Sequence, residues 1–367
     1  MICVVLLCAA LCVGCGTVPA GARTPSATQE PVYERYSMSF FDTFDTVVTI
    51  MAYAPDEETF RAATAEAQAT FQRLHRLYDG YHAYEGIHNV YTLNHQAWQA
   101  PVEVPQELMD LLLFCQANQP RTEGTVNIAL GAVLALWHAY RDEGLMDDAR
   151  AMLPPMADLQ AAARHTDMTS LVLDAERGTV FYADAALRLD VGAVAKGYAA
   201  EVVAQQLLAS PIPSFLISAG GNVRAGRAPL DGVRKAWGIG VQDPEGSIFP
   251  TASDSVETFF AAELSLVTSG TYQRYYEVDG VRYHHLIDPA TLMPGDHYQA
   301  VTVLTEDSGM ADLLSTAVFL LPYARSRALV ESLPGVDALW ILPDGTMEMT
   351  DGARALAKSA GATSVKR

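Results

Sequence analysis

The hydrophobic pattern of the chain alternates between strand-like and helix-like stretches. Residues 45–53 (Asp-Thr-Val-Val-Thr-Ile-Met-Ala-Tyr) alternate and are rich in β-branched side chains, which predicts a strand. Over residues 56–79 the apolar side chains recur every three or four positions, which predicts a long amphipathic helix. The same reasoning predicts helices over 105–117, 128–141, 193–209 and 309–321 and another opening at Pro322, with strands over 170–174, 179–182, 187–190, 214–219, 236–242, 263–268 and 299–305. The two element types mix without a strict βαβ rhythm, so the pattern favours an α+β fold.

The amino-terminal end has the pattern of an export signal. The first fifteen residues are uncharged and apolar, too short a run to span a bilayer but typical of a secretory signal. Their end, Leu-Cys-Val-Gly-Cys, resembles a bacterial lipobox, which would leave Cys15 as a lipidated N-terminus on the extracytoplasmic side of the cell membrane, in the periplasm of a Gram-negative cell. An ordinary cleaved signal peptide is the alternative.

The remaining sequence predicts a tether, one large folded region and a tail. Residues 16–32 are rich in Gly, Pro, Ala and Thr and are expected to be flexible. Residues 33–350 contain no Pro- or Gly-rich linker, so any two subdomains must be interleaved, and residues 351–367 are expected to form a C-terminal tail.

Composition narrows the possible partners. The chain has 367 residues, half of them apolar, and a formal net charge of −19, which argues against binding to nucleic acid or adhesion to anionic lipid. An anionic ligand must therefore be held by local donors or by a metal. Cys115 is the only cysteine beyond Cys15, which excludes a disulfide framework and a cysteine-based metal site.

Asp312 and Thr316 are the first candidates for chemistry. They lie four residues apart in a predicted helix, so both side chains share one face. A carboxylate and a hydroxyl are hard-oxygen ligands that suit Mg²⁺, which usually keeps open positions for substrate phosphates. Taken alone, such a pair is more often a solvated helix face.

Four further segments add candidates, each of which has a structural explanation when taken alone. Residues 190–198 have the form of a strand, a glycine turn and a helix start, where N–H groups and Lys196 suit an anion. Residues 215–222 run into Gly-Gly, and residues 266–272 end in small hydroxyl residues followed by Arg274, a possible bidentate phosphate partner. Residues 283–289 hold two adjacent histidines, of which one is expected to be structural and the other a general base near a metal-bound phosphate. No His-x-x-x-His spacing and no Gly-x-Ser-x-Gly motif occurs, which weakens zinc and serine-hydrolase interpretations.

Taken in order, these segments resemble the FAD:protein FMN transferase (ApbE) family over residues 40–345. The motifs that carry the resemblance are Asp-Val-Gly-Ala-Val-Ala-Lys-Gly-Tyr (190–198), Thr-Ser-Gly-Thr-Tyr (268–272), His-Leu-Ile-Asp-Pro (285–289) and Ala-Asp-Leu-Leu-Ser-Thr (311–316). The resemblance implies an α+β fold of two interleaved subdomains with an FAD and Mg²⁺ site between them. It also implies transfer of FMN from FAD to a Thr or Ser hydroxyl of an acceptor protein, with release of AMP.

The resemblance also assigns roles to individual residues. It implies Mg²⁺ ligands at Asp312, Thr316 and the backbone oxygen of Ala193, with Ser315 near the metal, and His285 as the catalytic base. The residues it implies around FAD are Phe44, Tyr81, Thr125, Val126, Asn127, Asp190, Lys196 and Ile287. Three positions depart from the family pattern: Phe44-Asp-Thr46 replaces Met-Gly-Thr, and Asn127 and Asn222 each replace Asp.

Two other functions stay open. The same site would serve an FAD pyrophosphatase that yields FMN and AMP, and a lipid anchor with a tether would suit a non-catalytic flavin-binding lipoprotein. Acceptors of the family, in redox membrane complexes or FMN-binding domains, carry Asp-x-x-Ser/Thr-Gly/Ala-Ser/Thr. The nearest match in this chain, residues 266–271, lacks the leading Asp, so self-flavinylation is not expected there.

Overall fold

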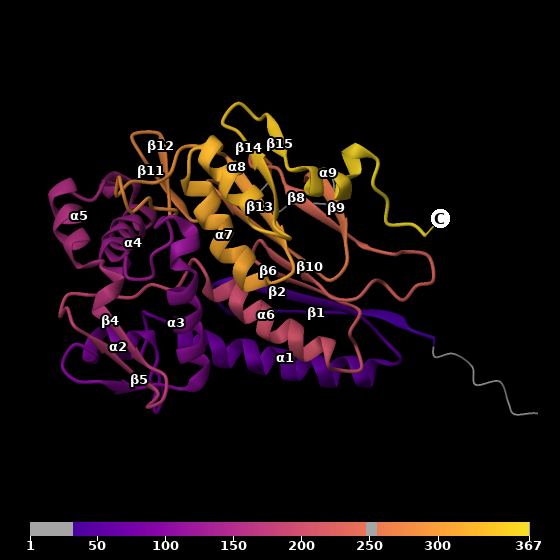
Figure 1. Ribbon diagram of the computed structural model, residues 1–367, viewed down its shortest axis with the longest axis horizontal. Coiled ribbons are helices and arrows are strands. Elements are labelled where there is room, and N and C mark those ends of the chain that lie inside the picture. Colours follow the sequence, from indigo (N-terminus) through magenta and orange to yellow (C-terminus); the bar gives the residue numbers. More distant parts are fainter. Residues whose placement is uncertain (1–31, 247–254, 367) are drawn as a thin grey trace, which may run out of the picture. The chain divides into compact units, whose positions relative to one another are not determined.

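An antiparallel sheet of eight strands organises the chain (Figure 1). The computed structural model describes residues 32–246 and 255–366. Every neighbouring pair in the sheet is antiparallel. In spatial order the strands are β1 (Glu34–Thr43), β2 (Thr46–Ala54), β6 (Phe215–Ala219), β7 (Asn222–Ala225), β10 (Leu264–Gly270), β13 (Ala300–Thr305), β14 (Asp337–Ile341) and β15 (Met347–Met349).

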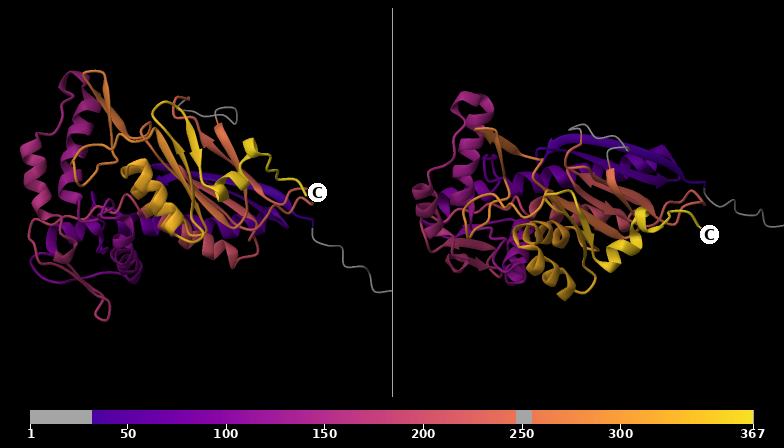
Figure 2. Two further views of the ribbon diagram at one scale, coloured as in Figure 1. Left: turned by 45° about the horizontal axis from the view of Figure 1, so that its top comes forward. Right: turned by 90° about the horizontal axis from the view of Figure 1, so that it is seen from above.

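The two faces of this sheet are covered by different elements. The helices α1 (Glu57–Tyr78), α6 (Ala195–Leu208), α7 (Ser308–Leu320) and α8 (Tyr323–Ser332) pack on one face. A hairpin of β8 (Trp237–Gln242) and β9 (Ser255–Ala261), with α9 (Asp351–Leu356), packs on the other (Figure 2). A strand covered on both faces must place apolar side chains on each. In β13, Val301 and Val303 pack into the core on the helix side, and Ala300 and Leu304 pack into the core on the opposite side.

A mostly helical region and a small hairpin adjoin the helix side of the sheet. The region comprises α2 (Val90–Gln96), β3 (Val102–Glu103), α3 (Gln106–Asn118), α4 (Gly131–Met146), α5 (Met156–Ala162), β4 (Leu171–Asp174) and β5 (Thr179–Tyr182), with 3-10 turns η1 (Gln119–Thr122), η2 (Asp148–Arg150), η3 (Ala163–His165) and η4 (Met168–Ser170). The hairpin of β11 (Tyr275–Val278) and β12 (Val281–His284) packs against α4 through a core that includes Trp137, Tyr276 and Ile287. This contact brings residues near 285 to residues near 130.

The strongly periodic predictions are confirmed. The strand over 45–53 is β2, and the helix over 56–79 is α1, where the Asp56 carboxylate accepts the N–H of Thr59 as an N-cap. The predicted helices over 105–117, 128–141, 193–209 and 309–321 are α3, α4, α6 and α7, and α8 follows Pro322. The Asp307 carboxylate accepts the N–H of Met310, which sets the start of α7 and therefore the face on which Asp312 and Thr316 lie.

Two parts of the prediction differ from the structure. Residues 187–190 do not form a strand, because only an isolated bridge between Leu130 and Arg188 pairs with them. Residues 351–366 are not a separate tail: they form α9 and η5 (Lys358–Ala360), and the side chains of Ala353 and Ala357 are fully buried. Residues 33–367 form one compact unit, and its division into two interleaved subdomains stays a prediction. In the described ranges, no helix combines the length and apolarity needed to cross a membrane.

Candidate active site

Residues from many separate parts of the chain surround a cavity of about 840 Å³. Its wall combines the start of α6, the middle of α7, the end of β10, the segment before α4 and the segment after β12. The predicted site residues that line it are Thr125, Val126, Asn127, Asp190, Ala193, Lys196, His285, Ile287, Asp312 and Thr316. Phe44 and Tyr81 instead line an adjoining cavity of about 660 Å³, which shares Asp190, Lys196 and Arg274 with the first.

The Asp312 carboxylate is anchored at the start of α6. Its side chain is buried, and Oδ2 accepts the N–H of Gly197 at 2.7 Å, with Lys196 Nζ at 3.9 Å. Gly197 is the third residue of α6, so its N–H has no partner within the helix and is free to hold an acidic group. Burial raises the pKa of Asp312, while the charge of Lys196 and the N–H of Gly197 act in the opposite direction.

Gly197 is required because α6 and α7 approach each other closely here. A Cβ atom at this position would overlap the backbone oxygen of Ser308 and the Cβ of Asp312. The Lys-Gly pair in the sequence motif therefore has two separate roles: Lys196 supplies charge to the cavity, and Gly197 allows Asp312 to reach the helix start.

The oxygen atoms around Asp312 fit a hard divalent cation. The hydroxyl of Thr316 lines the cavity and makes no hydrogen bond within the described part of the chain. Because the N–H of Gly197 is committed to Asp312, the carbonyl oxygen of Ala193 is released from the usual four-residue helical bond. One carboxylate, one hydroxyl and one carbonyl oxygen suit Mg²⁺ better than zinc. Among the described residues, no three His, Cys, Asp or Glu side chains are grouped for a metal ion.

Ser315 is not brought to this cavity. Its hydroxyl donates to the backbone oxygen of Asp312 at 2.9 Å and lies 2.9 Å from the hydroxyl of Ser269. Ser315 is fully buried and joins α7 to β10. The structure therefore gives it a packing role in place of the expected contact with the metal.

The two adjacent histidines have different environments. Both ring nitrogens of His284 are engaged, because Nε2 donates to the oxygen of Gly295 at 2.8 Å and Nδ1 accepts the N–H of Leu286 at 3.2 Å. His285 faces the cavity, and its Nδ1 is buried without a hydrogen-bond partner among the described residues. Burial, together with the charges of Arg274 and Lys196, holds the pKa of His285 well below its ordinary value. His285 is therefore the histidine available to take a proton.

The segment before α4 lines the cavity, and its polar side chains bond within the protein. The Asn127 amide donates to the oxygen of Thr166 at 2.8 Å, and its Oδ1 accepts the N–H of Ala129 at 2.8 Å. The Thr125 hydroxyl donates to the oxygen of Thr122 at 2.6 Å. These side chains shape the segment, and an aspartate at position 127 would lack the donor for Thr166.

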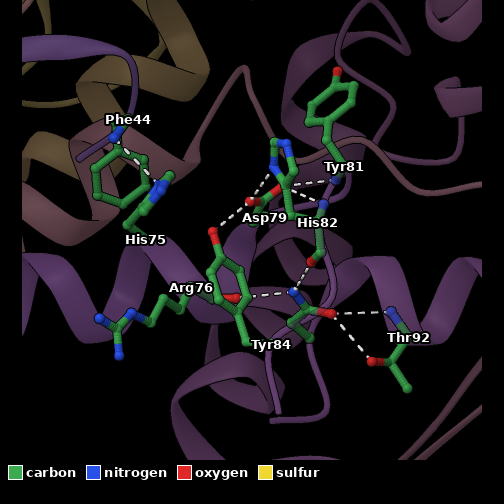
Figure 3. Close-up of polar contacts among 9 residues, drawn as sticks. Phe44, His75, Arg76, Asp79, Tyr81, His82, Tyr84 and Thr92 are labelled. Atoms are coloured by element: carbon green, nitrogen blue, oxygen red, sulfur yellow. Dashed lines mark hydrogen bonds and ion pairs between the residues drawn. The ribbon is translucent and has the colours of Figure 1, made fainter. Parts of the chain in front are cut away.

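Phe44 and Tyr81 are held at the second cavity by neighbouring side chains (Figure 3). Phe44 has a φ of 54° in the turn between β1 and β2, and its N–H donates to Nδ1 of His75 at 3.2 Å. The Asp79 carboxylate accepts the N–H of Tyr81 at 2.6 Å, and the Tyr81 hydroxyl donates to Oδ2 of Asp190 at 3.0 Å. Asp190 thus joins the 79–84 turn to the start of α6.

Comparison with known proteins identifies the family. The model of the ApbE family matches residues 44–340. The chain belongs to the ApbE family. A protein of Treponema pallidum (strain Nichols) named FAD:protein FMN transferase is 36% identical over 267 residues, 71% of this chain and 72% of the relative. A protein of the same name from Klebsiella pneumoniae (strain 342) is 30% identical over 80% of this chain and 85% of its own length.

A solved structure supports the same conclusion for the fold. The crystal structure of the ApbE protein from Thermotoga maritima superposes with a TM-score of 0.75 at 26% identity, covering 88% of this chain and 99% of that one. The expected α+β architecture of an ApbE protein is therefore confirmed.

One cavity residue of this ApbE protein, His138, was missed in the sequence, whereas Arg274 was named there as a possible phosphate partner. His138 lies on α4, and its Nδ1 is 2.6 Å from the Tyr81 hydroxyl. Burial lowers the pKa of His138, and the charge of Asp190 acts in the opposite direction. Arg274 follows β10 and lines both cavities. A motif search had no signal for His138, since only tertiary packing brings α4 to Tyr81.

Proposed function

We propose that this ApbE protein is an FAD:protein FMN transferase, which moves FMN from FAD to a Thr or Ser hydroxyl of an acceptor protein and releases AMP. The observation that carries the proposal is the meeting of Asp312, Thr316, Lys196 and His285 in one cavity. Oxygen donors for a cation, a fixed positive charge and a neutral histidine are the parts that phosphoryl transfer needs. The relatives that bear this enzyme's name support the same reaction.

We infer that Asp312, Thr316 and the carbonyl oxygen of Ala193 hold Mg²⁺. The bound ion would supply neutralisation of the diphosphate charge in a protein whose own net charge is −19. Lys196, 3.9 Å from Asp312, adds a second positive charge beside the same group.

His285 acts as the general base in this scheme. Its lowered pKa keeps the imidazole neutral at pH 7, so it accepts the proton of the acceptor hydroxyl. The hydroxyl oxygen bonds to the phosphorus of the FMN half, and the bond from that phosphorus to the bridging oxygen breaks. The electron pair leaves with the AMP phosphate.

We also propose that Cys15 carries lipid and anchors the enzyme to the extracytoplasmic side of the cell membrane. Cys15 and the tether over 16–31 lie outside the described residues. The lipobox-like end of the apolar run supports this location. The acceptors would then be extracytoplasmic proteins with an Asp-x-x-Ser/Thr-Gly/Ala-Ser/Thr segment.

The test is the mass of an acceptor domain incubated with the full chain, FAD and MgCl₂. We expect a gain of one FMN residue, and no gain with EDTA, with the acceptor's Thr or Ser replaced by Ala, or with Asp312→Ala. Rapid AMP release with an unmodified acceptor would identify an FAD pyrophosphatase instead. FAD that stays intact would identify a flavin-binding protein, and either result would overturn the proposal.

A further inference from the structure

Arg274 lies where the two cavities meet. It lines both of them, from the turn that joins β10 to β11. Its φ is 47°, in the left-handed region that non-glycine residues seldom adopt. Such a conformation persists only where the surroundings impose it, and it often accompanies a functional requirement.

In the described part of the chain, the guanidinium of Arg274 has a neutral partner only. Its Nη2 donates to the carbonyl oxygen of Phe44 at 3.1 Å, and no carboxylate among residues 32–246 and 255–366 forms an ion pair with it. Arg282 lines the first cavity too, but it is paired with Glu277 at 3.2 Å and lies over the ring of Tyr275. Arginine has five N–H donors, so most of those on Arg274 remain available to a ligand.

The charge of Arg274 acts on groups around the whole junction. It contributes to lowering the pKa values of His285 and His138, and it opposes the raised pKa values of Asp312 and Tyr81. These four groups belong to four different segments of the chain. The guanidinium therefore faces the same space as the predicted metal ligands and the base.

We propose that Arg274 is a catalytic residue, which binds phosphate oxygens of the FAD diphosphate and stabilises the negative charge that leaves with AMP. This role rests on the proposed function. As the bond to the bridging oxygen breaks, negative charge grows on the AMP phosphate, while the acceptor proton passes to His285. A planar guanidinium can meet two phosphate oxygens at once, and charge-assisted bonds of this kind are roughly twice as strong as neutral ones. Arg274 keeps its bond to Phe44 throughout, which holds the fork in position.

The experiment compares steady-state FMN transfer by the full chain carrying Arg274→Ala or Arg274→Lys. We expect Arg274→Ala to lower kcat by about 10²–10³-fold with a smaller change in KM for FAD, by analogy with other residues that stabilise transition-state charge. Millimolar guanidinium should restore part of the lost rate in Arg274→Ala. Arg274→Lys should retain an intermediate rate, because lysine keeps the charge but loses the fork.

Two control variants separate this role from a structural one. Arg73→Ala removes an arginine that is paired with Glu107 at 2.8 Å and lines neither cavity, and should leave kcat within a few-fold. His75→Ala removes the bond to the N–H of Phe44, which loosens the same turn from its other side and leaves the charge of Arg274 in place.

The outcomes decide the matter. The proposal fails if Arg274→Ala transfers FMN at the wild-type rate. It also fails if His75→Ala slows transfer as much as Arg274→Ala does and guanidinium restores the rate of neither variant, because Arg274 would then merely hold the turn. If Arg274→Ala does not fold, Arg274→Lys provides the test. A fully active Arg274→Lys enzyme would show that the two parallel N–H donors of the guanidinium are not needed. If the wild-type enzyme does not modify the acceptor, the proposed function is wrong. If the wild type is active and the Arg274 variants are equally active, only the role of Arg274 is wrong.

Discussion

At the scale of single residues, neighbours in the chain have unlike chemical roles. His284 is 5% exposed and uses both ring nitrogens to hold the 284–295 loop, whereas Nδ1 of His285 is buried without a hydrogen-bond partner in the part of the chain that the structure describes. The two side chains differ because His284 is the last residue of β12, whereas His285 lies in the bend that follows the strand. One histidine is therefore part of the core, and the other is part of the cavity wall.

The first prediction separates these two histidines. His285→Ala should lower the rate of FMN transfer by roughly 10²–10⁴-fold, the usual contribution of a general base, with nearly unchanged FAD affinity. His284→Ala should instead lower thermal stability, since it loses the bond to Gly295 and the contact with the ring of Phe319, and should retain more activity per folded molecule. Initial rates and melting temperatures of both variants check this. A slower His284→Ala enzyme would refute the assignment.

The second prediction concerns pH. A general base must be neutral, so the rate falls as pH drops through its pKa. Because burial, Arg274 and Lys196 lower the pKa of His285, the acid limb of the kcat profile should lie below pH 6.5, lower than the limb near neutrality expected of an ordinary histidine. Lys196→Met should move this limb toward higher pH, because it removes a positive charge. An unmoved limb, or one that persists in His285→Ala, would assign it to another group.

At the scale of elements, the docking of α6 against α7 builds the site. The N–H of Gly197 binds Asp312, and a turn earlier in α7 the N–H of Ser308 binds Oε2 of Glu201 at 2.8 Å. The same oxygen accepts Nε of Arg224 at 3.0 Å, which ties both helices to β7. The positions of the proposed metal ligands therefore depend on the separation of two helices.

The third prediction tests this separation. Gly197→Ala should force α6 and α7 apart, at a cost of about 1–3 kcal/mol in the free energy of unfolding, and should abolish Mg²⁺-dependent transfer even where the protein remains folded. Gly238→Ala is the control, because its Cβ would meet only side-chain atoms, the ring of Phe260 at 3.3 Å and Cγ2 of Thr258 at 3.7 Å, on the far side of the sheet. Denaturant unfolding and transfer assays measure both effects. An active Gly197→Ala enzyme would show that the close approach is not needed.

At the scale of the whole molecule, the cavity exists because segments distant in the chain are folded together. The antiparallel sheet holds α6, α7 and the end of β10, while the helical region contributes residues 125–130 and the hairpin carries residues 285–287 against α4. No single element holds more than part of the site.

The fourth prediction concerns the attachment of this unit to the cell. Cys15→Ser should leave the enzyme unprocessed or release it from the membrane, without lowering the specific activity of the solubilised protein, because the cavity is built within residues 33–367. Cell fractionation and the mass of the mature N-terminus measure this. Soluble, unlipidated wild-type protein in the cytoplasm would contradict the lipid anchor.

The sequence by itself determined the elements with strong periodicity and the residue types of the site. Helices α1, α6 and α7 were predictable because each keeps a regular spacing of apolar side chains over several turns, and the four-residue spacing of Asp312 and Thr316 places them on one helical face. Strands β7, β11 and β14 were missed while the equally short β4 and β5 were predicted, because four or five residues only sometimes carry a pattern regular enough to distinguish a strand from a turn.

Only the tertiary structure decided which side chains act together. Residues 187–190 have a strand-like pattern, but a strand needs a paired neighbour, and the chain offers them a single bridge. The role of Ser315 depends on its hydrogen bond with Ser269. His138 is placed by its contact with Tyr81, and Arg274 by its contact with Phe44, each more than fifty residues away in the chain. Local sequence dictates backbone conformation through nearby interactions, whereas the partners of a polar side chain depend on packing between segments that no local pattern records.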